Sequence, residues 1–329
     1  MTWLEGRLQP FSWSHSRAAL YRTCPRRYYY RYYAPYGRNS PAEQGDRTLC
    51  HLLGKLSVVP MMVGRVVHAL ADGSLRAAMA GNPWPAGSLE ASARVSLTRL
   101  IRGSQRAMRA PASSRPLRTA GTILDEHYYR LPFGPEAEGA ALDRAVTYAR
   151  RLHQHPLYAL ALACPERVLS LEAVGRMEVA GFPVYAVPDL VLRLDDGRIA
   201  VVDWKTGAAV AERLAQHAAQ LAVYALYVAG RWQVEEGRLT GLVADLNEGQ
   251  SIEVPFGEGA MRRVEEEIAA SVVCLRAALD DPDANVASAR RFPPLAAGSM
   301  PLGDLPGACV PCPFRVLCYG ERVVGWVPG

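Results

Sequence analysis

The chain has 329 residues, of which 50% are hydrophobic and 21% are charged, and its formal net charge is +5 at pH 7. This composition is typical of a globular protein with one large domain or two smaller ones. It excludes a bilayer-spanning helix, because no apolar run approaches the ~20 residues that such a helix needs. The N-terminal stretch MTWLEGRLQPF lacks the basic-then-apolar order of a secretory signal, so we expect a cytoplasmic protein with no membrane partner. The modest positive charge permits a polyanionic partner without requiring one.

The N-terminal region combines a helix signal with a run of arginine and tyrosine. A serine cap predicts a helix from near His15, and Cys24-Pro25 interrupts it. Residues 26–33 then read RRYYYRYY. Arginines interleaved with aromatic rings suit phosphate contacts and base stacking, but tyrosines also pack into cores with their hydroxyls reaching water, and both interpretations stand. Residues 38–60 predict a loop or a short ordered insertion.

Helices are expected through the next hundred or so residues. Residues 61–80 look helical, and Gly64 and His68 share one face of that helix because they are four apart. Turn-rich segments separate three further helical stretches, at about 88–109, 117–130 and 139–155. Arginines recur along the first of these: Arg94, Arg99, Arg102, Arg106 and Arg109. They fit either a nucleic-acid channel or a solvated face.

Beyond residue 166 the pattern changes to strands, which are rich in apolar and β-branched residues. The expected elements, in order, are a strand at 167–179, a hairpin at 183–205, a helix at about 209–230, strands at 238–246 and 251–256, a helix at about 258–280 and a loop at 281–308. The hairpin is apolar on both faces, as in a sheet covered by helices. This segment predicts an α/β fold.

The hairpin carries two aspartates whose pairing depends on the turn. Residues 195–197, DDG, have the form of a three-residue loop with glycine where a left-handed backbone is wanted. If this loop closes the hairpin, Leu194 faces Arg198. Counting back, Asp189 then faces Asp203 directly. A two-residue turn would instead put the two acids on opposite faces.

The opposed aspartates predict a metal site. Directly opposed side chains have Cβ atoms roughly 5 Å apart, and two ionised, unpaired carboxylates that close repel. A hard divalent cation removes this penalty because it takes oxygen ligands. Lys205 lies two residues after Asp203, so both point to one face, and the same register places Val187 opposite Lys205. Lys205 is one of two lysines among 37 basic residues, and arginine does not replace lysine where a compact point charge is needed.

Three of the seven cysteines form a cluster near the C-terminus: Cys309, Cys312 and Cys318. Cys50, Cys164 and Cys274 are isolated and are interpreted as plain buried thiols, and Cys24 stands alone near the N-terminus. Disulfides do not persist in a reducing compartment, so the C-terminal cluster points to a metal or iron–sulfur site.

Taken together, the motifs resemble the PD-(D/E)XK nucleases of the RecB type. The motifs in chain order are Gly64-x-x-x-His68, Pro188-Asp189, Asp203-x-Lys205 and Gln220-x-x-x-Tyr224. One cysteine before the nuclease core and three after it resemble the iron–sulfur branch, which includes the AddB nuclease domain, exonuclease V and the CRISPR-adaptation nucleases. The resemblance covers roughly 11–33, 61–72 and 167–320.

The resemblance implies an α/β fold with a central mixed sheet flanked by helices, a restriction-endonuclease-like core, together with a helical insert and an iron–sulfur-stapled terminus. The expected regions are an N-terminal helix and loop at 1–60, a helical region at 61–166, the nuclease core at 167–280 and a C-terminal loop at 281–329. The four cysteines would ligate a [4Fe–4S] cluster. Zinc is the alternative, since four thiolates also suit tetrahedral Zn²⁺.

The resemblance also implies a metal-binding set. Asp189 and Asp203 would bind Mg²⁺ or Mn²⁺, with His68 as an additional ligand and the Trp204 carbonyl as another candidate. The metal would lower the pKa of a bound water and offset charge on the phosphate.

The remaining site residues would serve the same reaction. Lys205 would orient the water or stabilise the transition state electrostatically. Gln220 and Tyr224 would position the lysine side of the site or the nucleic-acid backbone. Glu172, on the preceding strand, is a candidate to hold a metal-bound water.

The expected function is therefore a metal-dependent DNA nuclease, acting on single strands or DNA ends in repair, recombination or defence. The alternative is a non-catalytic iron–sulfur DNA-binding subunit of a helicase–nuclease or CRISPR-adaptation complex. No phosphate-binding loop of the form G-x-x-x-x-G-K-[ST] is present. A helicase partner would thus be a separate chain.

Overall fold

The computed structural model describes residues 10–36, 44–85, 87–109, 123–207 and 210–325. The chain divides into two compact units. We call them the sheet unit, made of Pro60–Arg99 and Pro135–Ala269, and the cysteine unit, made of Met1–Val59, Leu100–Gly134 and Ala270–Gly329. Each is described by itself.

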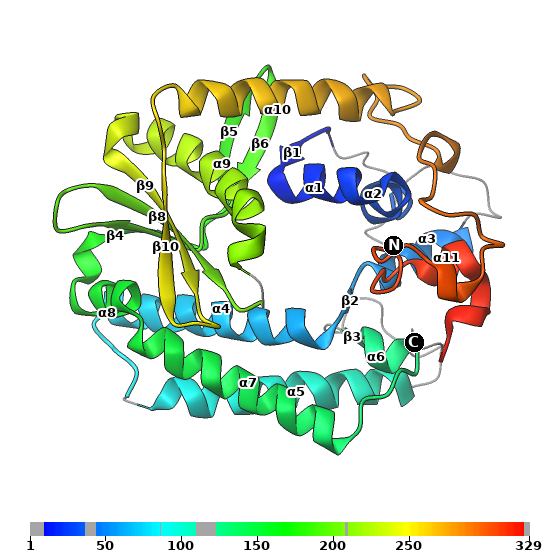
Figure 1. Cartoon of the computed structure of the whole chain (residues 1–329), viewed down its shortest axis with the longest axis horizontal. Helices are drawn as coiled ribbons and strands as arrows, with labels where there is room; N and C mark the ends of the chain where they lie inside the picture. The colour runs from blue at the N-terminus through cyan, green and yellow to red at the C-terminus, as the bar shows by residue number, and fades with distance from the viewer. Residues whose placement is uncertain (1–9, 37–43, 86, 110–122, 208–209, 326–329) are drawn as a thin grey trace, which may run out of the picture. The chain divides into compact units, whose positions relative to one another are not determined.

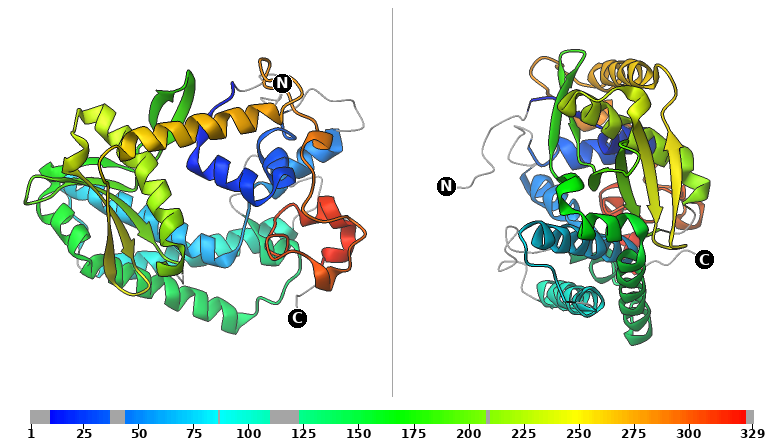
Figure 2. Two further views of the ribbon diagram at one scale, coloured as in Figure 1. Left: turned by 45° about the horizontal axis from the view of Figure 1, so that its top comes forward. Right: turned by 90° about the vertical axis from the view of Figure 1, so that its left-hand side faces the viewer.

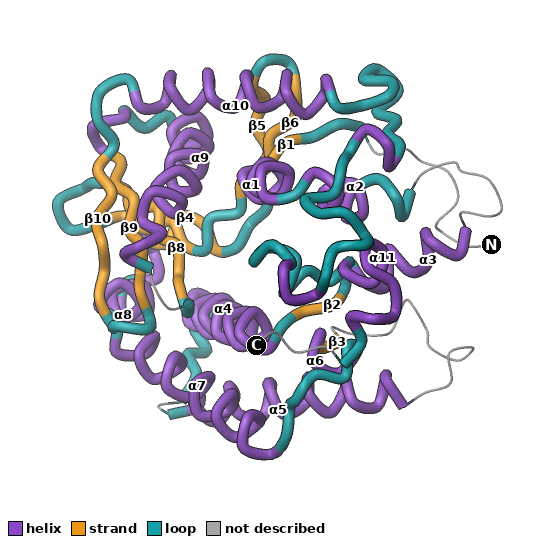
Figure 3. The backbone as a smooth tube through the Cα atoms, turned by 45° about the vertical axis from the view of Figure 1, so that its right-hand side comes forward, coloured by secondary structure: helices purple, strands orange, loops and turns teal. Residues whose placement is uncertain are grey.

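A five-stranded mixed sheet forms the core of the sheet unit (Figures 1 and 3). Its order is β10 (Gln250–Pro255), β9 (Leu239–Asp245), β8 (Ile199–Lys205), β7 (Leu190–Arg193) and β4 (Val168–Leu171). β8 and β9 are parallel, and the other neighbours are antiparallel. Every residue of β9 is buried, as are all of β8 before its last residue, which explains the apolar sequence on both faces. The predicted mixed sheet is confirmed.

Two of the expected strands are interrupted. The strand predicted at 167–179 ends with β4, and a separate strand, β5 (Gly175–Val179), pairs with β6 (Phe182–Ala186). The predicted hairpin is shorter than expected, because β6 belongs to that second pairing and β7 begins only at Leu190. Pro188 lacks an N–H to donate, which favours the break at this point. The expected pairing of Val187 with Lys205 is therefore wrong.

Helices cover both faces of the sheet. On one face, Leu221, Ala225 and Val228 of α9 (Leu214–Trp232) pack against apolar side chains of β7, β8 and β9, and the further views keep α9 against the strands (Figure 2). On the opposite face, Trp204 meets the ring of His155 edge-on at 5.4 Å. His155 caps α8 (Pro156–Ala163), a helix that the sequence patterns did not predict. α4 lies on the same face as α8, because Ser74 of α4 and Tyr158 of α8 share a hydrogen bond of 2.6 Å.

The long helices match three of the predicted stretches. They are α4 (Val59–Met79), α5 (Ser88–Arg109) and α7 (Pro135–Gln154). α5 and α7 run side by side (Figure 1), and Arg94 of α5 pairs with Asp143 of α7 at 2.7 Å. All five α5 arginines are exposed, as the solvated-face interpretation expects.

The helix predicted at 117–130 lies partly outside the described residues. Its described part contains β3 (Ile123–Leu124) and the short α6 (Asp125–Tyr128) instead. β3 pairs in parallel with β2 (Leu56–Ser57). Where a loop or insertion was expected at 38–60, the described residues contain α3 (Gln44–Leu53).

The N-terminal helices of the cysteine unit follow the prediction. β1 (Trp13–Ser14) leads into α1 (His15–Thr23), and the Ser14 hydroxyl accepts the N–H of Arg17. α1 ends before Cys24, and α2 (Pro25–Tyr32) starts with proline at its first position, where a missing N–H costs nothing.

The tyrosines of α2 and its end build a core. Tyr28, Tyr29 and Tyr33 are buried, and their rings stack on Phe292 with centroids 5.7–6.1 Å apart. The core interpretation therefore holds for these three, because a buried ring cannot stack on a nucleobase.

The C-terminal part of the cysteine unit is held by a buried ion pair. Arg315, the first residue of α11 (Arg315–Tyr319), donates two hydrogen bonds to the Asp125 carboxylate at 3.1 and 2.6 Å. Its guanidinium also lies 3.4 Å from the ring centroid of Tyr129. Before this region, α10 (Ala260–Ala277) is followed by the loop predicted after about residue 280.

Among the described residues, no helix combines the length and the apolar character needed to cross a bilayer.

Candidate active site

The two aspartates of the shortened hairpin face each other as predicted. The Leu194 N–H donates to the Arg198 carbonyl at 2.9 Å, which closes a three-residue loop. The ladder then runs to the pair Leu190–Val202. One further step places Asp189 opposite Asp203, and the Asp189 carboxylate accepts the Trp204 N–H at 2.8 Å. The register prediction is confirmed.

Glu172 reaches the same place through the pairing of β4 with β7. This ladder pairs Leu171 with Leu190, and one further step sets Glu172 opposite Asp189. Its backbone N–H donates to the Asp189 carbonyl at 3.2 Å. Glu172 has φ +37°, a left-handed conformation that a side-chain-bearing residue rarely adopts. Such strain is found where the surroundings hold a functional side chain in place.

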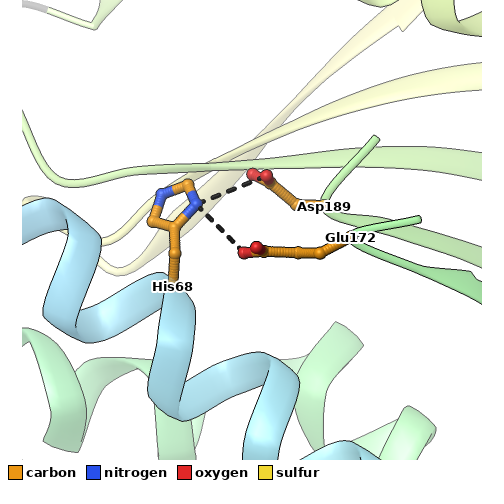
Figure 4. Close-up of side chains that lie close together, drawn as sticks. All are labelled: His68, Glu172 and Asp189. Atoms are coloured by element: carbon orange, nitrogen blue, oxygen red, sulfur yellow. Dashed lines mark ion pairs between the residues drawn. The ribbon is translucent and has the colours of Figure 1, made fainter. Parts of the chain in front are cut away.

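His68 of α4 completes a group of three possible ligands. Its Nδ1 lies 3.3 Å from an Asp189 oxygen and 3.7 Å from a Glu172 oxygen (Figure 4). The ligand atoms of His68, Glu172 and Asp189 all lie within 4.8 Å of one another, close enough to hold one metal ion. This set differs from the predicted one, because Glu172 is a member and Asp203 is not.

The glycine of the Gly64-x-x-x-His68 motif has a packing reason. A Cβ built on Gly64 would lie 2.7 Å from the Thr206 hydroxyl oxygen. Thr206 directly follows β8, so a side chain at position 64 would require either the Thr206 hydroxyl or α4 to shift. Glycine thus lets the helix approach closely enough for His68, one turn later, to reach the acids.

The charges around His68 favour its protonated form. Burial alone would lower the pKa of His68, but the charge of Asp189 and hydrogen bonds to Asp189 and Glu172 raise that pKa to about 10. Metal coordination requires the neutral imidazole. A cation in this group would therefore displace the proton that now balances the carboxylates.

Asp203 is buried beside Lys205. Its Oδ2 lies 2.5 Å from the Lys205 Nζ, and the two groups form a salt bridge. Burial and then the charge of Asp189 raise the pKa of Asp203 to about 6, although Lys205 and His68 act in the opposite direction. A carboxylate offers about four lone-pair sites, so Asp203 can accept from Lys205 and still ligate a cation.

Lys205 is positioned by α9. Its ammonium donates to the Gln220 side-chain oxygen at 3.2 Å, and the Gln220 amide donates to the Tyr224 hydroxyl at 2.7 Å. Burial raises the pKa of Tyr224, which keeps the hydroxyl neutral. The spacing of four places both α9 residues on one face, so this chain of hydrogen bonds follows directly from the Gln220-x-x-x-Tyr224 motif.

Two residues behind the site were missed. Arg76 donates to the Leu171 carbonyl at 2.6 Å and to the Asp72 carboxylate at 2.7 Å. The Leu171 carbonyl belongs to the peptide that leads into the strained Glu172. Their spacing could have indicated them. Asp72 and Arg76 follow His68 by four and eight residues, so all three lie on one face of α4.

Trp204 contacts the site through its backbone. Its side chain is buried on the opposite face of the sheet, against His155. Its N–H, rather than its carbonyl, contacts Asp189. Metal binding by the carbonyl stays a prediction.

In the cysteine unit, the four predicted cysteines line one pocket: Cys24, Cys309, Cys312 and Cys318. Burial raises the pKa of Cys312 to about 12 and of Cys318 to about 11, and the neighbouring cysteines reinforce the shift for both. The four cysteines lie close enough together for their charges to interact. They therefore form a donor set for a metal or cluster that binds thiolates.

The comparisons with known proteins identify the family. The sequence pattern of the PD-(D/E)XK nuclease superfamily matches residues 12–319. None of the curated proteins matches the chain. The matched range includes His68, the opposed aspartates and Lys205, which the fold brings together at one end of β8. This chain belongs to the PD-(D/E)XK nuclease superfamily.

Proposed function

We propose that the protein is a metal-dependent DNA nuclease that acts on single strands or DNA ends. The observation that carries the proposal is the convergence of Asp189, Asp203 and Lys205 at one end of β8, with His68 and Glu172 on the other side of Asp189. Superfamily membership gives the coarse chemistry, phosphodiester hydrolysis with a divalent metal. The DNA substrate and the role in repair, recombination or defence are parts of the proposal.

The acidic group fits a hard divalent cation such as Mg²⁺ or Mn²⁺. Glu172 and Asp189 supply carboxylate oxygens, and His68 supplies a ring nitrogen within the same small volume. Asp203 adds a buried carboxylate, one oxygen of which also contacts the Lys205 ammonium. When bound, the cation would lower the pKa of a coordinated water and offset charge on the phosphate.

Lys205 acts on the substrate side of this group. Its ammonium is held between the Asp203 carboxylate and the Gln220 side chain. Fixed in this way, it stabilises negative charge that develops on the phosphate, and it orients the attacking water without forming a covalent bond. Tyr224 holds Gln220 and so keeps the ammonium in place.

The four cysteines are proposed to ligate a [4Fe–4S] cluster, which would place the protein in the RecB-like iron–sulfur branch. They come from both ends of the cysteine unit and line one pocket. A cluster ligated there joins the start of α2 to the C-terminal segment. Iron and acid-labile sulfide assays on anaerobically purified protein test this proposal, and stoichiometric zinc without iron would contradict it.

The nuclease proposal is tested by cleavage of DNA labelled at the 5′ or 3′ end, in single-stranded and duplex form, with Mg²⁺ or Mn²⁺. The Asp203→Ala and Lys205→Ala variants should lose cleavage. Matched controls are Asp143→Ala, an exposed acid on α7, and Lys55→Ala, the other lysine, and both should cleave like the unchanged protein.

Two outcomes would count against the proposal. Full cleavage by both site variants would separate the activity from this site. DNA binding without cleavage by the unchanged protein, under all metal conditions, would favour the alternative of a non-catalytic subunit that works with a separate helicase or an adaptation complex.

A further inference from the structure

We propose that the hydroxyl groups of Tyr319 and Tyr30 set the reduction potential of the group held in the four-cysteine pocket, by donating hydrogen bonds to two of its sulfur ligands. This inference rests on the proposed iron–sulfur cluster and is independent of the nuclease activity. It assigns a role to Tyr319 and to Tyr30, and the sequence patterns left Tyr30 between core packing and base stacking.

The best-defined contact joins Tyr319 to Cys309. The Tyr319 hydroxyl donates to the Cys309 Sγ at 3.4 Å, and both residues are buried. Tyr319 is the last residue of α11, one position after Cys318. The segment that supplies late ligands therefore also supplies a donor to one of them.

The second contact joins the two ends of the cysteine unit. Tyr30, on α2, lines the same pocket as Cys318, and its hydroxyl acts on the pKa of the Cys318 thiol as a hydrogen-bond donor. The same hydroxyl accepts a hydrogen bond from the Arg26 guanidinium at 3.4 Å. The Tyr30 ring packs against Phe314 with ring centroids 5.7 Å apart and lies under the Arg26 guanidinium, so these contacts hold the side chain at the pocket.

The remaining two sulfurs have backbone donors. The Arg27 N–H donates to the Cys24 Sγ at 3.4 Å at the start of α2. The Phe314 N–H is a donor to Cys312. Each of the four sulfurs therefore has a donor among the described residues, two from side chains and two from the backbone, and only the side-chain pair can be removed by mutation.

The physical consequence concerns charge. Reduction adds an electron to an iron–sulfur cluster and increases the negative charge on its sulfurs. A hydrogen bond to a ligand sulfur stabilises that charge, so it favours the reduced form and raises the reduction potential. The low dielectric of a buried pocket strengthens this effect.

The alternative is that these hydroxyls merely find partners because buried tyrosines need them. Tyr129 provides the matched comparison. It is also buried in the cysteine unit, but its hydroxyl donates to the Pro313 carbonyl at 2.9 Å and to no sulfur. Removing that hydroxyl tests the loss of a buried hydrogen bond without loss of a sulfur donor.

The experiment is an anaerobic redox titration of the full chain, followed by visible absorbance and electron paramagnetic resonance. It compares the unchanged protein with Tyr319→Phe, Tyr30→Phe, the double variant and Tyr129→Phe. We expect a lower midpoint potential in both single variants, a larger shift in the double variant, and no comparable shift in Tyr129→Phe. Iron and sulfide content, measured on each sample, shows that the variants retain the cluster.

Resonance Raman spectra give a second readout. It would not change if the two hydroxyls had only a structural role. Iron–sulfur stretching frequencies should rise in Tyr319→Phe and Tyr30→Phe, because the sulfur–iron bond strengthens when the donor is lost. Equal midpoints in all variants, or a shift in Tyr129→Phe as large as in the others, would overturn the inference. Zinc in place of a cluster would overturn it together with the cluster proposal, whereas a protein with the cluster but without nuclease activity would leave it intact.

Discussion

The Lys205 ammonium lies 2.5 Å from the Asp203 carboxylate, and both belong to the buried end of β8. The two residues are the acid and the lysine of the D-x-K motif. Their separation by one residue places both side chains on one face of the strand, where Asp189 from the neighbouring strand faces them. The pair therefore links the metal-binding side of the site to α9 through Gln220.

Replacing Lys205 with methionine should remove cleavage while leaving metal binding measurable. Methionine keeps most of the side-chain volume but supplies no charge at the phosphate. Loss of a fixed electrostatic group of this kind costs about 10²–10³ in turnover. Single-turnover cleavage and Mn²⁺ titration should be measured in parallel, with Lys55→Met as the control. A variant that binds Mn²⁺ and cleaves at the normal rate would contradict the assigned role.

Replacing His68 with alanine should weaken Mn²⁺ binding. The imidazole nitrogen lies close to both Asp189 and Glu172, so its loss removes one ligand and leaves the two carboxylates unbalanced. We expect at least a tenfold loss of affinity by calorimetry, on the order of effects seen at such sites. His153→Ala, on the exposed face of α7, is the control. Unchanged affinity would remove His68 from the ligand group.

Metal affinity should rise with pH. The pKa of His68 is raised to about 10 in the metal-free protein, so below that pH a cation must displace one proton to bind the ring. Linkage then predicts a rise of about tenfold in affinity per pH unit between pH 7 and 9. Asp203, with its pKa raised to about 6, adds a second displaced proton only at lower pH. Calorimetry in buffers of different ionisation enthalpy measures the released protons, and His68→Ala should flatten the dependence.

Replacing Arg76 with alanine should lower metal affinity without touching a ligand. Arg76 holds the carbonyl that precedes Glu172, and Glu172 has a strained backbone conformation that needs such support. We expect a loss of about tenfold, because residues that orient ligands typically contribute 10–100-fold. Arg94→Ala removes a similarly exposed arginine that pairs with Asp143 and should have no effect. Equal affinities for both variants would show that Glu172 is held without Arg76.

Replacing Arg315 with methionine should destabilise the protein. The residue is 2% exposed and makes two hydrogen bonds to Asp125. Removing one partner of a buried pair leaves the other charge without compensation and costs about 3–5 kcal/mol. Urea denaturation measures the loss of unfolding free energy. A double variant with Asp125→Leu should be less destabilised than Arg315→Met alone, and a greater loss in the double variant would contradict this explanation.

Much of the site follows from local patterns. The glycine-bearing loop at residues 195–197 sets the hairpin register, and the register sets Asp189 opposite Asp203. The Gln220-x-x-x-Tyr224 spacing gives a hydrogen-bonded pair on one helix face. Proline after Cys24 separates α1 from α2. In each case neighbours in sequence decide the geometry.

Other features depend on contacts between distant segments. Glu172 joins the ligand group because β4 pairs with β7 and ends one residue before Glu172, and because α4 brings His68 to the same point. A run of strand-forming residues gives no signal for where the ladder ends or for which helix packs there. Tyr28, Tyr29 and Tyr33 are buried against Phe292, which lies far along the chain, and no pattern near residue 28 predicts that ring.

The sequence by itself determined the chemistry of this protein: two acids and a lysine in a strand hairpin, a histidine one helical turn after a glycine, and four cysteines at the two ends. Only the tertiary structure decided which of these side chains share a site. Glu172, rather than Asp203, lies in the group of three possible ligands, and Asp203 pairs with Lys205. The physical reason is that periodicity and turn chemistry act over a few residues. The position of a carboxylate within an ångström depends on how separate strands and helices pack.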